Sequence, residues 1–254
     1  MHSMNTPFIS IITVVYNAAA LVRRTIDSVV SQDYPHLEYI IVDGASTDGT
    51  QEVIALYGEA IAQWVSEPDK GIYDAMNKGL AMARGHYVWF LNAGDTLPNR
   101  STVSEMAATL PANALPSVIY GETLICDGEG RAIGLRRKKA PDQLTWRSFR
   151  QGMVVCHQAI LVERTLAERF DLQYRISADF AWVLAALKRS RSVHNSRMVL
   201  AHYMQDGLSR QNIVTSLRER ARIMAGYFGW PSVVWNHLLM IPRFLAFRLR
   251  FGRF

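Results

Sequence analysis

The stretch FISIITVVYNAAA, residues Phe8–Ala20, begins the alternation of strand and helix that indicates the fold of this chain. Residues Phe8–Tyr16 are almost all apolar and rich in Ile and Val, which predicts a buried strand. Apolar side chains then recur at helical spacing over Ala20–Gln32, so an amphipathic helix should follow. A strand that leads directly into a helix opens a strand–helix–strand unit and indicates a parallel sheet.

The same alternation continues as far as residue 95. We expect strands and helices in turn over Leu37–Val42, Thr50–Tyr57, Gln63–Ser66, Asp74–Ala83 and His86–Leu91. This order is typical of an α/β protein with a mainly parallel sheet flanked by helices. Beyond residue 115 the alternation is less regular, and we expect a strand at Ser117–Ile125, a loop or hairpin at Gly134–Arg150, a helix at Ala178–Arg189 and helices towards the C-terminus.

Composition excludes several classes of protein. Hydrophobic residues make up 49% of the 254 and charged residues 20%, which excludes a disordered chain. The two cysteines, Cys126 and Cys156, cannot form a disulfide framework and fit a reducing cytosol. No secretory signal precedes the first apolar run, and no apolar stretch is long enough to span a membrane. We therefore expect a cytoplasmic protein.

The positive charge is concentrated at one end of the chain. Residues 210–254 hold eight arginines against one glutamate, a net charge of +7, whereas the whole chain carries +6. The rest is therefore close to neutral, which argues against a nucleic acid as partner. Pro231–Phe254 combines aromatic residues with four arginines and has no acid, which suits the anionic inner face of a cell membrane. The alternative is a helix pair that packs on the domain or on a partner subunit.

The turn after the first strand excludes the common nucleotide-binding motifs. It reads Tyr-Asn-Ala-Ala-Ala, with no GxGxxG, and neither GxxxxGK(S/T) nor the hydrolase motif GxSxG occurs in the chain. Single acids follow two of the strands instead, namely Asp43 and Asp95. Both should lie at the carboxyl edge of the sheet, where an acid can accept from a nucleoside or ligate a cation. Equally, Asp43 can start a turn and Asp95 can cap the next helix.

Two long runs of the chain read ISIITVVYN…TIDSVVSQDYPHLEYIIVDGASTDGT and SEPDKGIYDAMNKGLAMARGHYVWFLNAGD. They resemble family 2 glycosyltransferases of the GT-A fold, and are similar to enzymes of colanic-acid and exopolysaccharide biosynthesis. The resemblance is dense over Phe8–Asp95 and continues through CHQAIL (Cys156–Leu161), YRISADFAWVL (Tyr174–Leu184) and QDGLS (Gln205–Ser209). It implies a Rossmann-like glycosyltransferase domain over residues 1–209, followed by a helical, basic segment over 210–254.

The resemblance also implies a role for individual residues. Those implied to bind the nucleotide sugar are Thr13, Tyr16, Asn17, Asp43, Glu67, Asp74, Asn77, Lys78, Asn92 and His157, of which His157 can equally be a core histidine. Asn92–Asp95 stands at the family's Asp-x-Asp metal motif, with Asp95 as the implied ligand of Mg²⁺ or Mn²⁺. The motif here reads Asn-Ala-Gly-Asp, so Asp95 falls one place after the usual last ligand and Gly94 has no side chain to offer.

Asp179 is the implied catalytic base, because it stands in YRISAD where the family keeps that group at the start of a helix. A carboxylate there would take the proton of the attacking acceptor hydroxyl. From spacing alone, Asp179 is also explained as a first-turn acid favoured by the helix dipole.

Two functions follow from these observations. The first is an inverting, metal-assisted glycosyltransferase that moves a sugar from a nucleotide-diphosphate sugar to a lipid-linked saccharide acceptor. It would act in bacterial surface-polysaccharide biosynthesis, as a peripheral protein on the inner face of the cell membrane. The second is a non-catalytic nucleotide-sugar-binding or scaffold protein of a polysaccharide assembly complex. Asn-Ala-Gly-Asp favours the second, whereas Asp43 and Asp179 favour the first.

Overall fold

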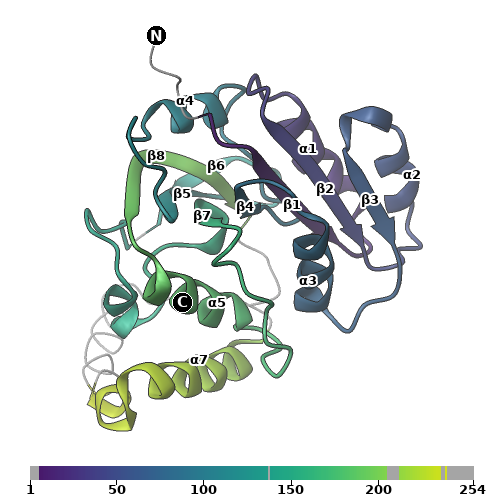
Figure 1. The fold of residues 1–254 in the computed structure, drawn as a ribbon. Helices are drawn as coiled ribbons and strands as arrows, with labels where there is room; N and C mark the ends of the chain where they lie inside the picture. The colour runs from purple at the N-terminus through teal and green to yellow at the C-terminus, as the bar shows by residue number, and fades with distance from the viewer. Residues whose placement is uncertain (1–5, 137, 205–211, 236–237, 239–254) are drawn as a thin grey trace.

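The computed structural model describes residues 6–136, 138–204, 212–235 and 238. They form one eight-stranded sheet with helices packed around it (Figure 1). The strand order is β3-β2-β1-β4-β7-β5-β6, and β8 pairs with β5 beside that path.

The first half of the chain forms the parallel part of the sheet. β1 lies between β2 and β4, and β3 follows at the far side of β2. The strands are β1 (Ile9–Val15), β2 (Leu37–Asp43), β3 (Gln63–Ser66) and β4 (Tyr87–Phe90), with the helices α1 (Ala19–Val30), α2 (Thr50–Ala55) and α3 (Ile72–Met82) and the 3-10 turn η1 (Gly58–Ala60) between them. This confirms the predicted alternation, with ends displaced by a few residues at most. Every residue of β1 is buried, because helices and loops cover both of its faces.

The second half of the chain makes the sheet a mixed one. β7 is antiparallel to both β4 and β5, β6 is antiparallel to β5, and only β8 runs parallel to its neighbour β5. The elements are α4 (Thr102–Ala108), β5 (Val118–Cys126), β6 (Ala132–Leu135), η2 (Trp146–Gln151), η3 (His157–Ala159), β7 (Ile160–Glu163), α5 (Ala178–Arg189), β8 (Val193–Met204) and α7 (Ile213–Phe228). The expectation of a mainly parallel sheet therefore holds for β1–β4 and not for the strands added after them.

Close packing of α3 on the sheet depends on one glycine. A Cβ at Gly79 would lie 2.4 Å from Cγ2 of Ile12 in β1 and 3.4 Å from Cγ2 of Val42 in β2. Only a residue without a side chain lets α3 approach this closely. The loop before α3 and the first turn of the helix are thereby held near the carboxyl ends of β1 and β2.

Helix α7 packs beside α5 (Figure 1). Its buried residues are Ser216, Ile223 and Met224, and Trp146 stacks on Phe228 at 5.4 Å between ring centroids. Residues 230–235 are also helical. QDGLS and most of the aromatic and arginine-rich tail lie outside the described residues. Within the described ranges, no helix combines the length and the apolar character needed to cross a membrane.

Candidate active site

Asp43 ends β2 and organises the loop that follows it. Its Oδ2 accepts from the backbone N–H of Ser46 at 2.9 Å and from the Ser66 hydroxyl at 2.6 Å, and its Oδ1 accepts from the Ser46 hydroxyl. The carboxylate is fully buried. This is the geometry of a turn-starting aspartate, and a contact to a nucleoside stays a prediction.

The loops after β1 and β2 are joined to each other. The Asn17 N–H donates to Ser46 Oγ at 2.7 Å, and the Thr47 N–H donates back to Asn17 Oδ1 at 2.9 Å. Asn17 has φ +46° and Ala45 has φ +62°, in the left-handed region that such residues seldom occupy. Backbone strain of this kind persists where the surroundings enforce it, commonly at functional sites. We call the surface formed by these two joined loops, around Asn17 and Ser46, the floor. Tyr16, which is 64% exposed, lies beside it.

The loop between β3 and α3 covers that floor. A Cβ at Gly44 would lie 2.5 Å from Asp69 Oδ2, so the Asp69 carboxylate lies directly over the start of the β2 loop. Lys78 Nζ donates to Pro68 O at 2.7 Å and pairs with Glu67 Oε1 at 3.0 Å. Asp74 Oδ2 accepts from the Lys70 N–H at 3.1 Å. Glu67, Asp74 and Lys78 therefore meet around one loop, and their contact with a nucleotide sugar stays a prediction.

Two residues from the predicted set use their polar atoms inside the protein. The Thr13 hydroxyl donates to Leu91 O at 2.7 Å and accepts from the Tyr39 hydroxyl at 2.9 Å. The Asn77 side chain donates to Phe170 O at 2.9 Å and accepts from the Phe170 N–H at 2.7 Å. Both side chains are buried, so here they stabilise the fold and present no free polar group to a ligand.

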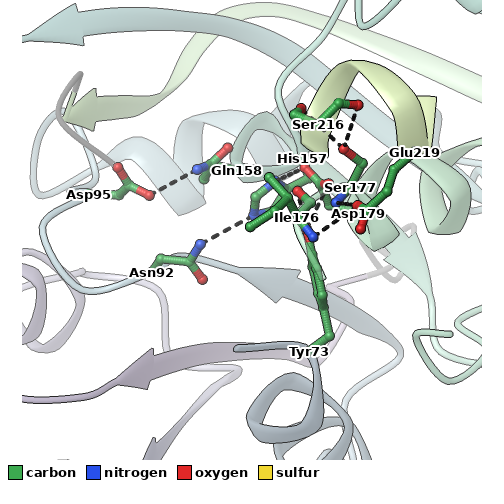
Figure 2. Close-up of polar contacts among 10 residues, drawn as sticks. All are labelled: Tyr73, Asn92, Asp95, His157, Gln158, Ile176, Ser177, Asp179, Ser216 and Glu219. Atoms are coloured by element: carbon green, nitrogen blue, oxygen red, sulfur yellow. Dashed lines mark hydrogen bonds and ion pairs between the residues drawn. The ribbon is translucent and has the colours of Figure 1, made fainter. Parts of the chain in front are cut away.

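A chain of side-chain contacts crosses the centre of the molecule (Figure 2). Asp179, at the start of α5, accepts from the Tyr73 hydroxyl at 3.0 Å on Oδ1 and contacts His157 Nδ1 at 3.1 Å on Oδ2. His157 Nε2 lies 3.4 Å from Asn92 Nδ2. His157 Nδ1 carries the proton that is donated to Asp179, and Nε2 on the other side of the ring faces the Asn92 amide. Tyr73 is the member of this chain that sequence reasoning missed, although it directly precedes Asp74.

The surroundings of Asp179 keep it ionised. Burial raises the pKa of this carboxyl, but the hydrogen bond and charge of His157, the charge of Arg220 on α7 and the Tyr73 hydroxyl together hold the pKa below its usual value. Burial, followed by the charge of Asp179, raises the pKa of Tyr73 well above its usual value. At neutral pH Tyr73 is therefore a donor and Asp179 an acceptor.

The Asp95 carboxylate is buried and hydrogen-bonded within the protein, unlike a metal ligand whose oxygens face a cation site. It is 4% exposed, and its Oδ2 accepts from Gln158 Nε2 at 3.0 Å (Figure 2). Its Oδ1 accepts from the Met204 N–H at 3.0 Å. Burial raises its pKa to about 6. Neighbouring Gly94 has φ +99°, and a Cβ there would meet Met204 Cε at 2.6 Å. The Asn-Ala-Gly-Asp loop is thus built against the end of β8.

The side chains around this loop do not fit a protein-held Mg²⁺ or Mn²⁺. Both Asp95 oxygens are engaged, and the one free oxygen nearby is Asn92 Oδ1, which is buried with no hydrogen-bond partner in the described part of the chain. No group of three His, Cys, Asp or Glu side chains able to hold a metal ion occurs among the described residues. Such cations take several oxygen ligands, so metal ligation by Asp95 stays a prediction that this arrangement does not favour.

Comparison with known proteins places the fold and the sequence in one family. An uncharacterized glycosyltransferase of Mycobacterium tuberculosis is 34% identical over 187 residues, which are 72% of this chain and 70% of that protein. A PGL/p-HBAD biosynthesis glycosyltransferase of Mycobacterium bovis is 28% identical over 93% of this chain and 96% of its own length. Among solved structures, S. aureus TarS 1-349 superposes with a TM-score of 0.66 at 18% identity. That match covers 85% of this chain and 65% of the TarS chain, and TarS has also been solved in complex with UDP and with UDP-GlcNAc.

The TarS likeness shows the fold, which is that of the GT-A structures expected from the sequence. The family is shown by sequence, because the model of glycosyl transferase family 2 matches residues 10–169, more than half of the chain. This chain belongs to glycosyl transferase family 2.

Proposed function

We propose that this protein is an inverting glycosyltransferase, which moves a sugar from a nucleotide-diphosphate sugar to a hydroxyl of an acceptor saccharide. The observation that carries the proposal is the buried, ionised carboxylate of Asp179, held by Tyr73 on one oxygen and by His157 on the other. A carboxylate fixed at both oxygens and kept in its basic form is the group that such a transfer needs.

The reaction would be a single displacement. The acceptor oxygen attacks the anomeric carbon on the face opposite the diphosphate, the bond from that carbon to the diphosphate oxygen breaks, and the configuration inverts. The proton of the acceptor hydroxyl passes to Asp179, and the nucleoside diphosphate leaves. His157 and Tyr73 would hold the carboxylate in line with the attacking hydroxyl, which is the orientation effect that positioning supplies.

The donor would bind over the floor made by the loops after β1 and β2. We assign the nucleoside to the region of Tyr16, Asn17 and Asp43. We assign the diphosphate to Lys78, whose ammonium contacts the loop between β3 and α3 beside Glu67. Family membership and the complexes of TarS with UDP and UDP-GlcNAc support a nucleotide sugar as donor. The leaving diphosphate would be neutralised at least in part by Lys78.

We further propose that the acceptor saccharide is carried on a lipid in bacterial surface-polysaccharide biosynthesis, and that the protein works as a peripheral protein on the inner membrane face. The resemblance to exopolysaccharide enzymes and the relation to a PGL/p-HBAD biosynthesis glycosyltransferase support the pathway class. The exposed side chains of Trp230, Val234, Trp235 and Leu238 supply apolar contact area close to the arginine-rich C-terminal sequence.

The experiment begins with thermal unfolding of the full chain against UDP, GDP, dTDP and CMP, each with and without Mn²⁺. A nucleotide at 100 times its dissociation constant should add ~2.7 kcal/mol to the free energy of unfolding. The corresponding labelled nucleotide sugar is then incubated with bacterial membrane lipid, and transfer into the organic-extractable fraction is measured.

Asp179→Asn should keep the nucleotide-induced shift and lose transfer by ~100-fold or more, as expected for a lost general base. Exposed Asp171→Asn, outside the site, is the control and should transfer at the wild-type rate. Full transfer by Asp179→Asn would refute the assignment of the base. A folded wild type that binds no nucleotide and transfers nothing would favour the scaffold function.

A further inference from the structure

The C-terminal helix α7 reaches back to the turn that precedes Asp179. The Glu219 carboxylate accepts from three consecutive backbone N–H groups: Arg175 at 2.8 Å on Oε1, and Ile176 at 3.0 Å and Ser177 at 2.9 Å on Oε2. Figure 2 shows Glu219 beside the last two of these residues. Glu219 is the only acidic residue in 210–254. A turn at the start of α5 is therefore held by a residue more than forty positions further along the chain.

Of these three residues, Arg175 is exposed and Ile176 is half-buried, whereas Ser177 is buried, so the N–H of Ser177 most needs a partner from outside its own segment. Ser177 is the N-cap of α5, yet its side chain makes no capping hydrogen bond, and the residue is fully buried. Buried N–H groups without acceptors are costly. Glu219 meets this need with charge-assisted bonds, which are roughly twice as strong as neutral ones, and places a negative charge at the positive end of the α5 dipole.

The same turn is fixed from its other side by Tyr73. The Tyr73 hydroxyl has one proton, which is shared between Ile176 O at 2.7 Å and Asp179 Oδ1 at 3.0 Å. Asp179 follows Ser177 by two residues, so a shift of the turn changes both the contact with Tyr73 and the direction of the carboxylate. Ser216 adds a second contact from α7, because its hydroxyl lies 3.2 Å from that of Ser177.

We infer that Glu219 is a positioning residue for the transfer reaction, acting through the turn Arg175–Ser177 on Asp179. This inference rests on the proposed function for its kinetic consequence, whereas its structural part concerns only the Asp179–His157 pair. The residues assigned to the donor lie on other elements. Loss of Glu219 should therefore change turnover and leave donor affinity unchanged.

The test compares Glu219→Gln and Glu219→Asp with Arg218→Gln in the full-length protein. Gln has the same length but directs an NH₂ group at one of the three N–H donors, whereas Asp keeps the charge on a shorter side chain. Arg218 is exposed on the same helix, and its replacement also changes the net charge by one unit, so it controls for charge and for the helix.

The first readout is nuclear magnetic resonance of the protein with labelled histidine, with the His157 signals assigned by their loss in His157→Gln. Glu219→Gln should shift the ring signals of His157, because the partner carboxylate moves. Arg218→Gln should leave them in place. Unchanged His157 signals in a folded Glu219→Gln protein would overturn the inference.

The second readout is kinetic. For Glu219→Gln, kcat should fall ~10- to 100-fold, since a displacement of about 1 Å has that cost, while the donor KM stays within ~2-fold. Glu219→Asp should fall between this variant and the wild type, and it replaces Glu219→Gln in both readouts if that variant does not fold. Equal losses in Arg218→Gln, or a change in KM alone, would contradict a positioning role. If the wild type transfers nothing, the proposed function fails, and the resonance readout still decides whether Glu219 positions Asp179.

Discussion

Two buried carboxyl groups have pKa values shifted in opposite directions, and their neighbours explain the difference. Asp179 faces the imidazole of His157 and the Tyr73 hydroxyl and lies within the field of Arg220, which together outweigh the effect of burial and lower its pKa. At Asp95 burial outweighs the hydrogen bonds from the Gln158 amide and the Met204 N–H and the charge of His157, so its pKa rises to about 6. Residue type alone does not distinguish these two environments.

Removing the Tyr73 hydroxyl should displace the Asp179 carboxylate and raise its pKa. In Tyr73→Phe, Asp179 loses one of the hydrogen bonds that stabilise its ionised form. The acid limb of the kcat profile should therefore move to higher pH, and kcat at neutral pH should fall ~10-fold or more. Tyr34→Phe is the control, because Tyr34 is also buried and donates to a carbonyl, that of Pro7, away from the site. An unmoved acid limb in Tyr73→Phe would separate Tyr73 from the base.

Asp95 should make the protein less stable as the pH rises. Its pKa lies at about 6 in the folded protein against 3.8 for an ordinary aspartate, so its contribution is fully present below pH 3.8 and is lost as the pH rises towards 6. The wild type should therefore lose ~3 kcal/mol of unfolding free energy relative to Asp95→Asn over this range and show no further change above it. Urea denaturation at a series of pH values measures the difference.

Asp127, a carboxyl at the surface, is the control, because its pKa is shifted in the opposite direction to that of Asp95. Hydrogen bonds from Arg131 hold the pKa of Asp127 below its usual value, so its small contribution is lost as the pH falls. A flat difference between wild type and Asp95→Asn would mean that Asp95 is open to water, and would restore it as a candidate metal ligand.

At the scale of elements, glycine decides how closely a helix approaches its neighbours. Gly79→Ala should push α3 away from the sheet, because the new Cβ would lie 2.4 Å from Ile12 Cγ2. A loss of ~1–3 kcal/mol is expected for such overpacking. Gly226→Ala, in the last turn of α7 and with no described atom beyond the helix within 4 Å of the added Cβ, should instead stabilise the protein by ~0.5–1 kcal/mol. Denaturant midpoints of the two variants test the pair, and a neutral Gly79→Ala would show that α3 can shift without cost.

The loops between elements are also interdependent. The first N–H groups of α1 are capped from the loop after β2, where Thr50 Oγ1 accepts from Ala18 and Asp48 Oδ2 accepts from Ala19, both at 3.1 Å. Asp48 also accepts from the N–H of Thr50 at the start of α2. One loop thus fixes the starts of two helices beside the region assigned to the donor.

At the scale of the whole molecule, the exposed apolar residues near the C-terminus should direct the protein to an anionic bilayer. Sedimentation with vesicles of phosphatidylglycerol should recover the full chain, whereas vesicles of phosphatidylcholine should recover little, because each arginine near an anionic surface contributes ~1 kcal/mol. Raising the salt concentration should weaken the binding.

The double variant Trp230→Ser/Trp235→Ser should bind ~10-fold more weakly or worse, since these side chains are 60% and 65% exposed and would lose their apolar contact with the bilayer. Leu56→Ser is the matched control, because Leu56 is 72% exposed but lies just after α2, remote from α7 (Figure 1). Equal binding by the double variant and the wild type would remove the membrane from the proposal.

The two halves of the chain contribute different parts of the proposed reaction. The parallel strands β1–β4 carry the loops assigned to the donor, whereas α5 carries the Asp179 carboxylate. They are joined where β7 pairs with β4, and η3, immediately before β7, places His157 between Asn92 and Asp179. Transfer would therefore depend on the β4–β7 pairing, which holds the region assigned to the donor beside Asp179.

The sequence by itself determined the alternation of strands and helices up to β4 and the long helix α5, because local hydrophobic periodicity is enough to specify such elements. The resemblance added the family and the set of candidate site residues. β7 and β8 were missed for a physical reason: β7 has four residues, and β8 is broken by polar residues and by register shifts against β5, so neither shows a local period.

Only the tertiary structure decided how the candidate side chains are used. Thr13 and Asn77 make core hydrogen bonds, Asp95 holds Gln158 and the end of β8, and Glu219 holds the turn before Asp179. Each of these roles is a contact between residues far apart in the chain. Local sequence does not indicate which distant hydrogen-bond donor will contact a given acceptor, because the packing of the strands and helices determines these pairs.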